Sequence, residues 1–143
     1  MKKNCFGLLL SCLFGCHSAQ MPDSQMVSYE YGYYNCTALP VLELEMHLNG
    51  SKVYVNLVQG SDTVRFEADK SLIDEVQRVF AEQKMYKYKP SYSPRFEVLD
   101  GYSWRYSAKF ADGASFASGG SNAWPSGDAL RQIAALVKQA AGL

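Results

Sequence analysis

The chain has 143 residues, 48% of them hydrophobic and 20% charged, and its 14 Lys and Arg balance its 14 Asp and Glu. This composition is typical of a globular protein and excludes a disordered tail, a collagen-like repeat and a highly charged nucleic-acid-binding arm. The length accommodates one domain but not two sizeable cores. The chain also has 10 Tyr, which a small domain can use as half-buried residues of a sheet.

The N-terminus has the layout of a secretory signal. Lys2 and Lys3 form a positively charged region, and residues 5–14 form an apolar stretch. A helix that crosses a bilayer needs roughly 20 apolar residues, so this stretch is too short to be one. We interpret it as the core of a signal peptide.

The end of that stretch, Leu13-Phe14-Gly15-Cys16, resembles the lipobox of bacterial lipoproteins. The resemblance implies cleavage after Gly15 and a diacylglyceryl thioether, with acyl chains such as palmitate, on Cys16. The alternative is an ordinary signal peptide followed by a coincidental cysteine. Because no acidic residue occurs before Asp23, resemblance to lipoprotein sorting rules favours the periplasmic face of the outer membrane.

These features divide the chain into a signal peptide at 1–15, a lipidated tether at 16–26 and a single domain at 27–143. Loss of the signal would remove two lysines and leave a net charge of −2. A nucleic-acid partner gains nothing from that charge, so the expected partner is the membrane, through the lipid on Cys16.

The cysteines do not form a disulfide framework. Cys5 and Cys12 would leave with the signal and Cys16 would carry lipid, so Cys36 has no intramolecular partner. We expect Cys36 to be a buried small hydrophobic residue rather than a reactive thiol.

Alternating apolar and polar residues predict a first β-hairpin. Residues 41–48 and 52–58 both alternate, and Asn49-Gly50 between them is a strong signal for a two-residue type I′ turn. We therefore expect an antiparallel pair in which Met46 lies opposite Val53, with the apolar residues of both strands on one face.

Two further strands extend this hairpin. A four-residue loop at 59–62 leads to a strand at 63–68 with Leu57 opposite Val64, and residues 27–34 form another strand. Three aromatic side chains of that last strand share one face: Tyr29, Tyr31 and Tyr33.

The apolar period then changes to that of a helix. The spacing predicts a helix over 72–84, with Ser71 and Asp74 in the arrangement of a capping box. A second helix follows Ser126, a suitable N-cap residue, and ends at Gly142.

A second hairpin lies between the two helices. Residues 102–110 alternate, but a two-residue turn would put Phe116 on the polar face. A three-residue loop at 111–113 instead pairs Ala108 with Phe116 and gives Gly113 the left-handed position. The element order is β-β-β-β-α-β-β-α, which predicts an α+β fold with an antiparallel sheet and two helices mainly on one face.

The segment after this hairpin, Ser118-Gly119-Gly120-Ser121-Asn122-Ala123-Trp124-Pro125, resembles the C-terminal part of uncharacterised small bacterial proteins with a Gly-x-Asn-Ala-aromatic-Pro sequence. The resemblance supports a fold and attaches no activity. Residues of this kind usually form turns, so we favour a structural role in which Asn122 bonds to the backbone and Trp124 covers the end of the sheet. The alternative makes Asn122 and Trp124 part of a binding lip.

No arrangement typical of catalysis or of a cofactor occurs in the chain. Glu43, Glu45 and His47 share one strand face and could hold a metal, but we favour a solvated face. We assign no catalytic, cofactor-binding or metal-binding residue.

Residues 84–95 are the most suggestive segment for a partner, because cations alternate there with aromatic residues. We place this segment outside the periodic core. Two interpretations are open: a surface that binds a partner, and a sheet edge whose lysines prevent association with another sheet, and we favour the second. The candidate partner-binding residues are Tyr86, Lys87, Tyr88, Lys89, Tyr92 and Trp124.

The sequence therefore predicts a lipid-anchored cell-envelope protein that acts as a binding or accessory module. Its partner would be an envelope protein, a glycan or a peptidoglycan fragment. The alternative is a small periplasmic inhibitor or an enzyme with dispersed active-site residues. A pocket lined by convergent polar groups would favour that alternative, and an aromatic patch without them would favour the binding module.

Overall fold

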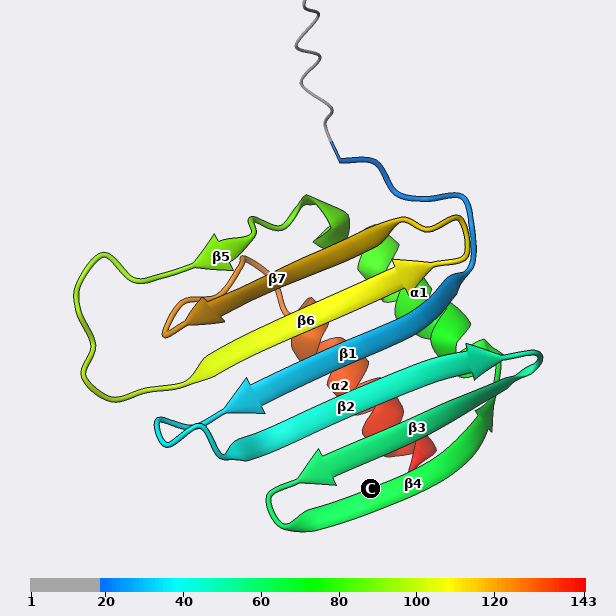
Figure 1. Ribbon diagram of the computed structural model, residues 1–143, viewed down its shortest axis with the longest axis horizontal. Helices are drawn as coiled ribbons and strands as arrows, with labels where there is room; N and C mark the ends of the chain where they lie inside the picture. Colours follow the sequence, from blue (N-terminus) through cyan, green and yellow to red (C-terminus); the bar gives the residue numbers. More distant parts are fainter. Residues whose placement is uncertain (1–18) are drawn as a thin grey trace, which may run out of the picture.

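The computed structural model describes residues 19–143, so the predicted signal peptide at 1–15 and the predicted lipid-attachment site Cys16 lie outside the described residues. A seven-stranded sheet has the strand order β4-β3-β2-β1-β6-β7-β5, and two α-helices lie on one of its faces (Figure 1). The predicted α+β class is confirmed. The elements are β1 (Met26–Tyr34), β2 (Pro40–Asn49), β3 (Lys52–Gln59), β4 (Asp62–Asp69), α1 (Ser71–Glu82), the 3₁₀-helix η1 (Met85–Lys87), β5 (Ser91–Tyr92), β6 (Ser103–Phe110), β7 (Ser115–Ser121) and α2 (Ala129–Ala140).

The sheet is mixed rather than wholly antiparallel. Neighbouring strands are antiparallel except β5 and β7, which run parallel. The predicted element order lacks β5, and the prediction of a purely antiparallel sheet is wrong at this edge. The reason is physical, because a strand of two residues is too short to show an alternating pattern.

The tyrosine-rich strand β1 is the middle strand of the sheet, between β2 and β6. Its odd-numbered tyrosines share one face, as predicted, and that face is the one covered by the helices, where Tyr29 and Tyr31 are buried. The ring of Tyr29 stacks on that of Tyr106 in β6, with centroids 6.2 Å apart. Aromatic rings therefore make up much of the layer between the sheet and the helices.

The hairpin of β2 and β3 forms, but its register differs from the predicted one by two residues. Val53 lies opposite Leu48 rather than Met46, because the turn is centred on Gly50-Ser51. Gly50 has a φ of 62°, and Ser51 is not among the residues with positive φ, which is the pattern of a type II′ turn. A shift of two residues keeps every side chain on its face, so the apolar faces still match.

The other two predicted turns give the expected pairing. Leu57 lies opposite Val64, and Ala108 lies opposite Phe116. Gly113 has a φ of 89°, the left-handed conformation that the three-residue loop requires. The predicted register is correct in both hairpins, but the four-residue loop expected at 59–62 is wrong, because Gln59 pairs with Asp62 and leaves a two-residue turn at 60–61.

Both helices form with their apolar faces toward the sheet, but their predicted N-cap residues are wrong. The N-cap residue of α1 is Lys70 and no side chain caps it, so Ser71 and Asp74 do not form a capping box. Asp74 instead forms an ion pair with Lys70, at 2.6 Å. The N-cap of α2 is Asp128 rather than Ser126. The buried helical side chains are Ile73, Val76, Val79, Phe80, Ala129, Leu130, Ile133, Ala134 and Val137.

The segment at 84–95 belongs partly to the core, contrary to prediction. Met85 is fully buried, and its carbonyl accepts a hydrogen bond of 2.7 Å from the hydroxyl of Tyr106. The rings of Tyr88 and Tyr106 pack edge to face at 6.0 Å, and those of Tyr92 and Trp104 lie 5.8 Å apart. The aromatic residues of this segment therefore extend the core beneath β6 and β7.

Cys36 is exposed, so the expectation of a buried cysteine is wrong. It lies in the connection between β1 and β2, where the side-chain oxygen of Asn35 accepts hydrogen bonds from the amides of Thr37 and Leu39. A turn closed in this way around Asn35 satisfies its own backbone and leaves Cys36 on the surface.

Candidate binding groove

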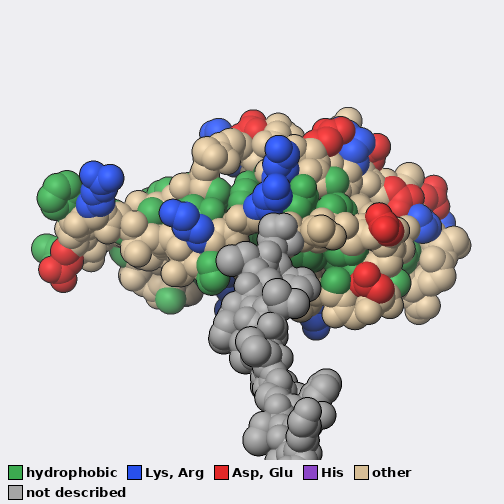
Figure 2. Space-filling view, turned by 90° about the horizontal axis from the view of Figure 1, so that it is seen from above, with side chains coloured by type: hydrophobic (Ala, Val, Ile, Leu, Met, Phe, Trp, Pro, Cys, Tyr) green, Lys and Arg blue, Asp and Glu red, His purple; other side chains and the backbone are tan. Residues whose placement is uncertain are grey.

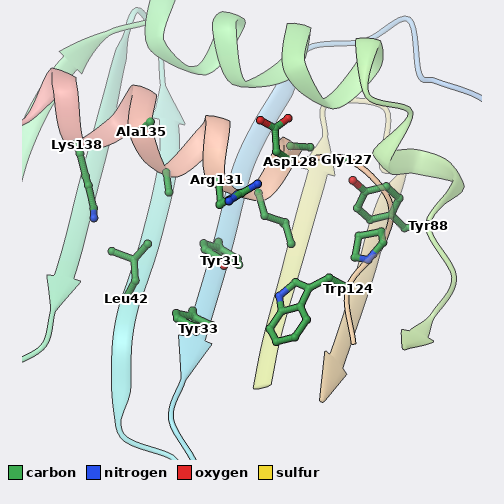
Figure 3. Close-up of a pocket in the computed structure, with 14 residues that line it drawn as sticks. Tyr31, Tyr33, Leu42, Tyr88, Trp124, Gly127, Asp128, Arg131, Ala135 and Lys138 are labelled. Carbon is green, nitrogen blue, oxygen red and sulfur yellow. The ribbon is translucent and has the colours of Figure 1, made fainter. Parts of the chain in front are cut away.

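A groove of about 590 Å³ lies between α2 and the sheet, on the face that the helices cover (Figure 3). Its floor is made by Tyr31 and Tyr33 of β1 and by Leu42 of β2. Tyr33 and Leu42 are directly opposite each other in the two strands. The sheet thus supplies a floor of aromatic and aliphatic side chains.

One end of the groove is closed by two aromatic residues from distant parts of the chain. Tyr88 follows η1, and Trp124 lies in the connection from β7 to α2. Figure 3 shows Trp124 and Tyr33 on the same side of Tyr31. Because 46% of Trp124 is exposed, its indole forms a lip that a ligand can reach.

Two hydrogen bonds fix the connection that carries Trp124, one from the backbone of Asn122 and one to its side chain. The amide of Asn122 donates to the carbonyl of Tyr102 at 2.9 Å, and its side-chain oxygen accepts from the amide of Tyr102 at 2.9 Å. Gly101 is required beside this pair, because a Cβ there would overlap the side chain of Asn122. The predicted bonding of Asn122 to the backbone is therefore observed.

A second contact holds the connection against the sheet. The indole nitrogen of Trp104, which is buried, donates to the carbonyl of Ala123 at 2.7 Å. A Cβ on Gly120 would lie 2.5 Å from that carbonyl oxygen, so only glycine fits without displacing it. Gly101, Gly120 and Asn122 therefore have structural roles whose result is a fixed position for Trp124 at the groove.

The wall opposite the floor is α2. Ala134 and Ala135 are small and leave room between the helix and the sheet. Lys138 extends from α2 toward the side of Leu42, and Arg131 lies between α2 and Tyr31 (Figure 3). Both cations line the groove, and neither forms an ion pair within residues 19–143.

Asp128 is the acidic residue of the groove lining, and its carboxylate points away from the floor. The carboxylate of Asp128 accepts a hydrogen bond of 2.7 Å from Gln132 one turn along α2. In Figure 3 this carboxylate points away from Tyr33 and Trp124. The formal charge that faces the floor is therefore positive.

The tyrosines of the groove are neutral at physiological pH. Burial, with a smaller contribution from Tyr33, raises the pKa of Tyr31 to about 12. Burial followed by the proximity of Tyr102 raises the pKa of Tyr33, and burial followed by Tyr92 and Asp128 raises that of Tyr88. Their rings therefore present aromatic faces and neutral hydroxyls to a ligand.

The structure brings two of the six predicted partner-binding residues, Tyr88 and Trp124, to the groove. Of the others, Tyr86 packs on Phe80, with ring centroids 6.4 Å apart, and Lys87 lies over the ring of Tyr86 at 5.8 Å. Lys89 is exposed, and Tyr92 packs between Tyr88 and Trp104. These four residues do not line the groove.

Sequence reasoning missed the two cations and most of the floor. The strand pattern placed Tyr31 and Tyr33 on one face without indicating a binding site there, and Arg131 and Lys138 were not among the candidate residues. The seven-residue spacing of the two cations, which puts them on one side of a helix, is the signal that could have found them.

Exposed apolar side chains gather at the end of the sheet beside Trp124. Among the described residues, nine large hydrophobic side chains are exposed, and seven of them lie at this end. The connection between β5 and β6 carries several of them and projects from the molecule (Figures 1 and 2). The seven are Leu39, Val41, Phe96, Val98, Leu99, Tyr102 and Trp124.

The opposite face of the sheet holds the residues weighed as a metal site. Glu43 accepts a hydrogen bond of 2.8 Å from the hydroxyl of Tyr34, and Glu45 accepts one of 3.3 Å from the side-chain nitrogen Nδ2 of Asn56. His47 lies opposite Tyr54 in the observed register. Within residues 19–143, no three His, Cys, Asp or Glu residues are grouped so that they could bind a metal ion.

No protein-family model matches the chain, and the search of curated proteins finds no match. Within residues 19–143, none of the helices combines the length and apolar character needed to cross a membrane.

Proposed function

We propose that this chain is a lipid-anchored protein of the bacterial cell envelope that acts as a binding or accessory module, with the groove under α2 as its binding site. The observation that carries the binding role is the groove itself, which has a volume of about 590 Å³ and an aromatic floor. Concave, mostly apolar sites of about 300–1,000 Å³ with a few placed polar groups are typical of ligand sites.

The side chains of the groove favour binding over catalysis. In the described part of the chain its lining contains no Ser, Thr, Cys or His. Nucleophilic catalysis needs an activated nucleophile, and the tyrosine hydroxyls of the lining are the opposite of activated, because burial raises the pKa of Tyr31, Tyr33 and Tyr88. The charged side chains Arg131 and Lys138 are also two helical turns apart, about 10 Å at 1.5 Å per residue, so they do not converge on one reacting atom.

The exposed apolar end of the sheet supports a role in contacting a larger partner. Exposed apolar side chains gathered beside a binding groove are typical of interaction sites. An envelope protein, a glycan or a peptidoglycan fragment would contact Trp124 and the stacked pair of Tyr33 and Tyr102, whose centroids are 5.2 Å apart.

The position of the proposed anchor is compatible with this role. The chain enters β1 at Met26, which pairs with Phe110 at the end of the sheet opposite Trp124. A lipid on Cys16, attached through the tether, would hold the domain while leaving the apolar end and the groove accessible. Two acyl chains anchor a protein stably, whereas one gives marginal binding.

The anchor is tested by intact-mass measurement of the membrane-extracted protein and by Cys16→Ala. We expect a mature N-terminus at Cys16 with added diacylglyceryl mass, and we expect the variant to lose lipid and lipoprotein-type cleavage. A mature N-terminus at another residue, or a mass without lipid, would overturn this part of the proposal.

The binding role is tested by photo-crosslinking in cells. A photoreactive phenylalanine analogue replaces Tyr33 in the groove or, as the matched control, Tyr54 on the opposite face. We expect a discrete crosslinked species from position 33 and none from position 54. No product from either position, or the same products from both, would contradict a groove-specific binding role.

A further inference from the structure

We infer that the groove selects ligands that carry an acidic group on an apolar or aromatic body, with the body on the tyrosine floor and the acid against Arg131 or Lys138. This inference rests on the proposed binding role and specifies the chemistry of its ligand. It follows from the separation of two kinds of surface within one groove.

The first surface is the floor. Tyr31, Tyr33 and Leu42 present aromatic and aliphatic groups, and the tyrosines remain uncharged at physiological pH. Trp124 adds a partly exposed indole at one end. Such a floor binds flat or aliphatic groups by burial and stacking and does not itself distinguish acids from bases.

The second surface is the helical wall, which supplies the charge. Arg131 and Lys138 line the groove from the same side of α2 and form no ion pair within the described residues. Asp128, which could neutralise one of them, bonds to Gln132 and points away from the floor (Figure 3). An acid that enters the groove therefore meets cations whose charge is not already satisfied by a neighbouring carboxylate.

The geometry also explains why a cationic ligand is disfavoured. A ligand ammonium on the floor would lie beside one of two cations in a partly enclosed site, where charges interact more strongly than in bulk water. The aromatic rings could attract such a cation. Two fixed positive charges on the facing wall oppose that attraction.

The experiment compares three probes that share one aromatic body: 2-naphthylacetate, 2-naphthylethanol and 2-naphthylethylammonium. Binding to the lipidated protein in phosphatidylcholine nanodiscs is measured by calorimetry, with empty nanodiscs as the blank. We expect the acid to bind about tenfold more tightly than the ammonium, with the alcohol between them. We also expect the affinity of the acid to fall as salt is raised.

The variants assign the selectivity to the helical wall. R131Q/K138Q should lower the affinity for the acid about tenfold and leave that for the alcohol unchanged. The matched control is R65Q/K109Q, which removes two exposed cationic side chains from the face of the sheet opposite the groove. Thermal unfolding of both variants checks the fold, and the single variants R131Q and K138Q replace the pair if it does not fold.

The outcomes separate this inference from the proposed function. Equal binding of all three probes, or unchanged acid binding in R131Q/K138Q, would overturn the selectivity while leaving the groove as a binding site. An equal loss of affinity in R65Q/K109Q would also overturn it, because the effect would then come from overall charge. If none of the probes binds, the inference fails, and the Tyr33 photo-crosslink decides the proposed function separately.

Discussion

Replacing Gly120 with alanine tests whether the Gly-Gly-x-Asn segment fixes the lip of the groove. The added Cβ would lie 2.5 Å from the carbonyl oxygen of Ala123 and 2.7 Å from the indole nitrogen of Trp104. These are the two atoms joined by a hydrogen bond of 2.7 Å, whose donor belongs to the buried side chain of Trp104. The methyl group therefore cannot be accommodated without moving the backbone that leads to Trp124.

The magnitude follows from two costs. Overpacking a tightly packed site costs about 1–3 kcal/mol, and leaving a buried donor without its acceptor costs about 1–3 kcal/mol more. We expect Gly120→Ala to lower the free energy of unfolding by about 3 kcal/mol. Urea unfolding, followed by far-ultraviolet circular dichroism, measures this loss as a lower midpoint with an unchanged slope.

Gly113→Ala is the matched control for this substitution. Gly113 has a φ of 89°, but a Cβ there would meet nothing within 4 Å. Its cost is the conformational penalty alone, about 1 kcal/mol. If Gly120→Ala costs no more than Gly113→Ala, the close approach at Gly120 does not fix the segment.

Three other outcomes follow from buried hydroxyls and from the proposed anchor. Tyr106→Phe should lower the free energy of unfolding by about 1–2 kcal/mol in urea, because it leaves the carbonyl of Met85 without a hydrogen-bond partner. Tyr29→Phe should lower it little, because the buried hydroxyl of Tyr29 has no hydrogen-bond partner among the described residues. Equal losses in the two variants would contradict this difference. The pKa of Tyr31 is raised from 10.0 to about 12, so its contribution to stability should be full below pH 10 and lost as the pH rises toward 12. Tyr31→Phe should flatten that part of the stability profile, and an unchanged profile would refute the assignment. Finally, Cys16→Ala should abolish the incorporation of labelled palmitate into the protein, and continued incorporation would argue against a lipid on Cys16.

The sequence predicts strand pairing well where turn chemistry and apolar pattern constrain each other. Phe116 faces the core only if the loop that ends at Gly113 has three residues, and the observed pairing of Ala108 with Phe116 confirms that length. The turn near Asn49-Gly50 was less constrained, because a shift of two residues preserves the apolar faces and cannot be detected from the pattern. β5 has two residues and pairs only because the core brings it beside β7.

Only the two aromatic residues at the end of the groove could be predicted from the sequence. Tyr88 and Trp124 stand out in the sequence as aromatic residues near prolines and turns, and both line the groove. Arg131 and Lys138 look like solvated positions of an amphipathic helix, because periodicity shows which side chains are outside the core and not which surface they face. Their role depends on where α2 crosses the sheet, and tertiary packing alone fixes that crossing.

We propose that this protein binds its partner in the groove under α2. The most direct test fills the groove with Ala135→Trp, because Ala135 lines it, and uses Ala140→Trp as the control, because Ala140 is an exposed residue of the same helix outside the lining. Native mass spectrometry of the protein released intact from its own membranes then measures bound mass. We expect the wild type and Ala140→Trp to carry the same noncovalent partner and Ala135→Trp to have lost it while keeping its circular-dichroism spectrum. A partner that stays bound to Ala135→Trp, or a wild type that carries none, would contradict the claim.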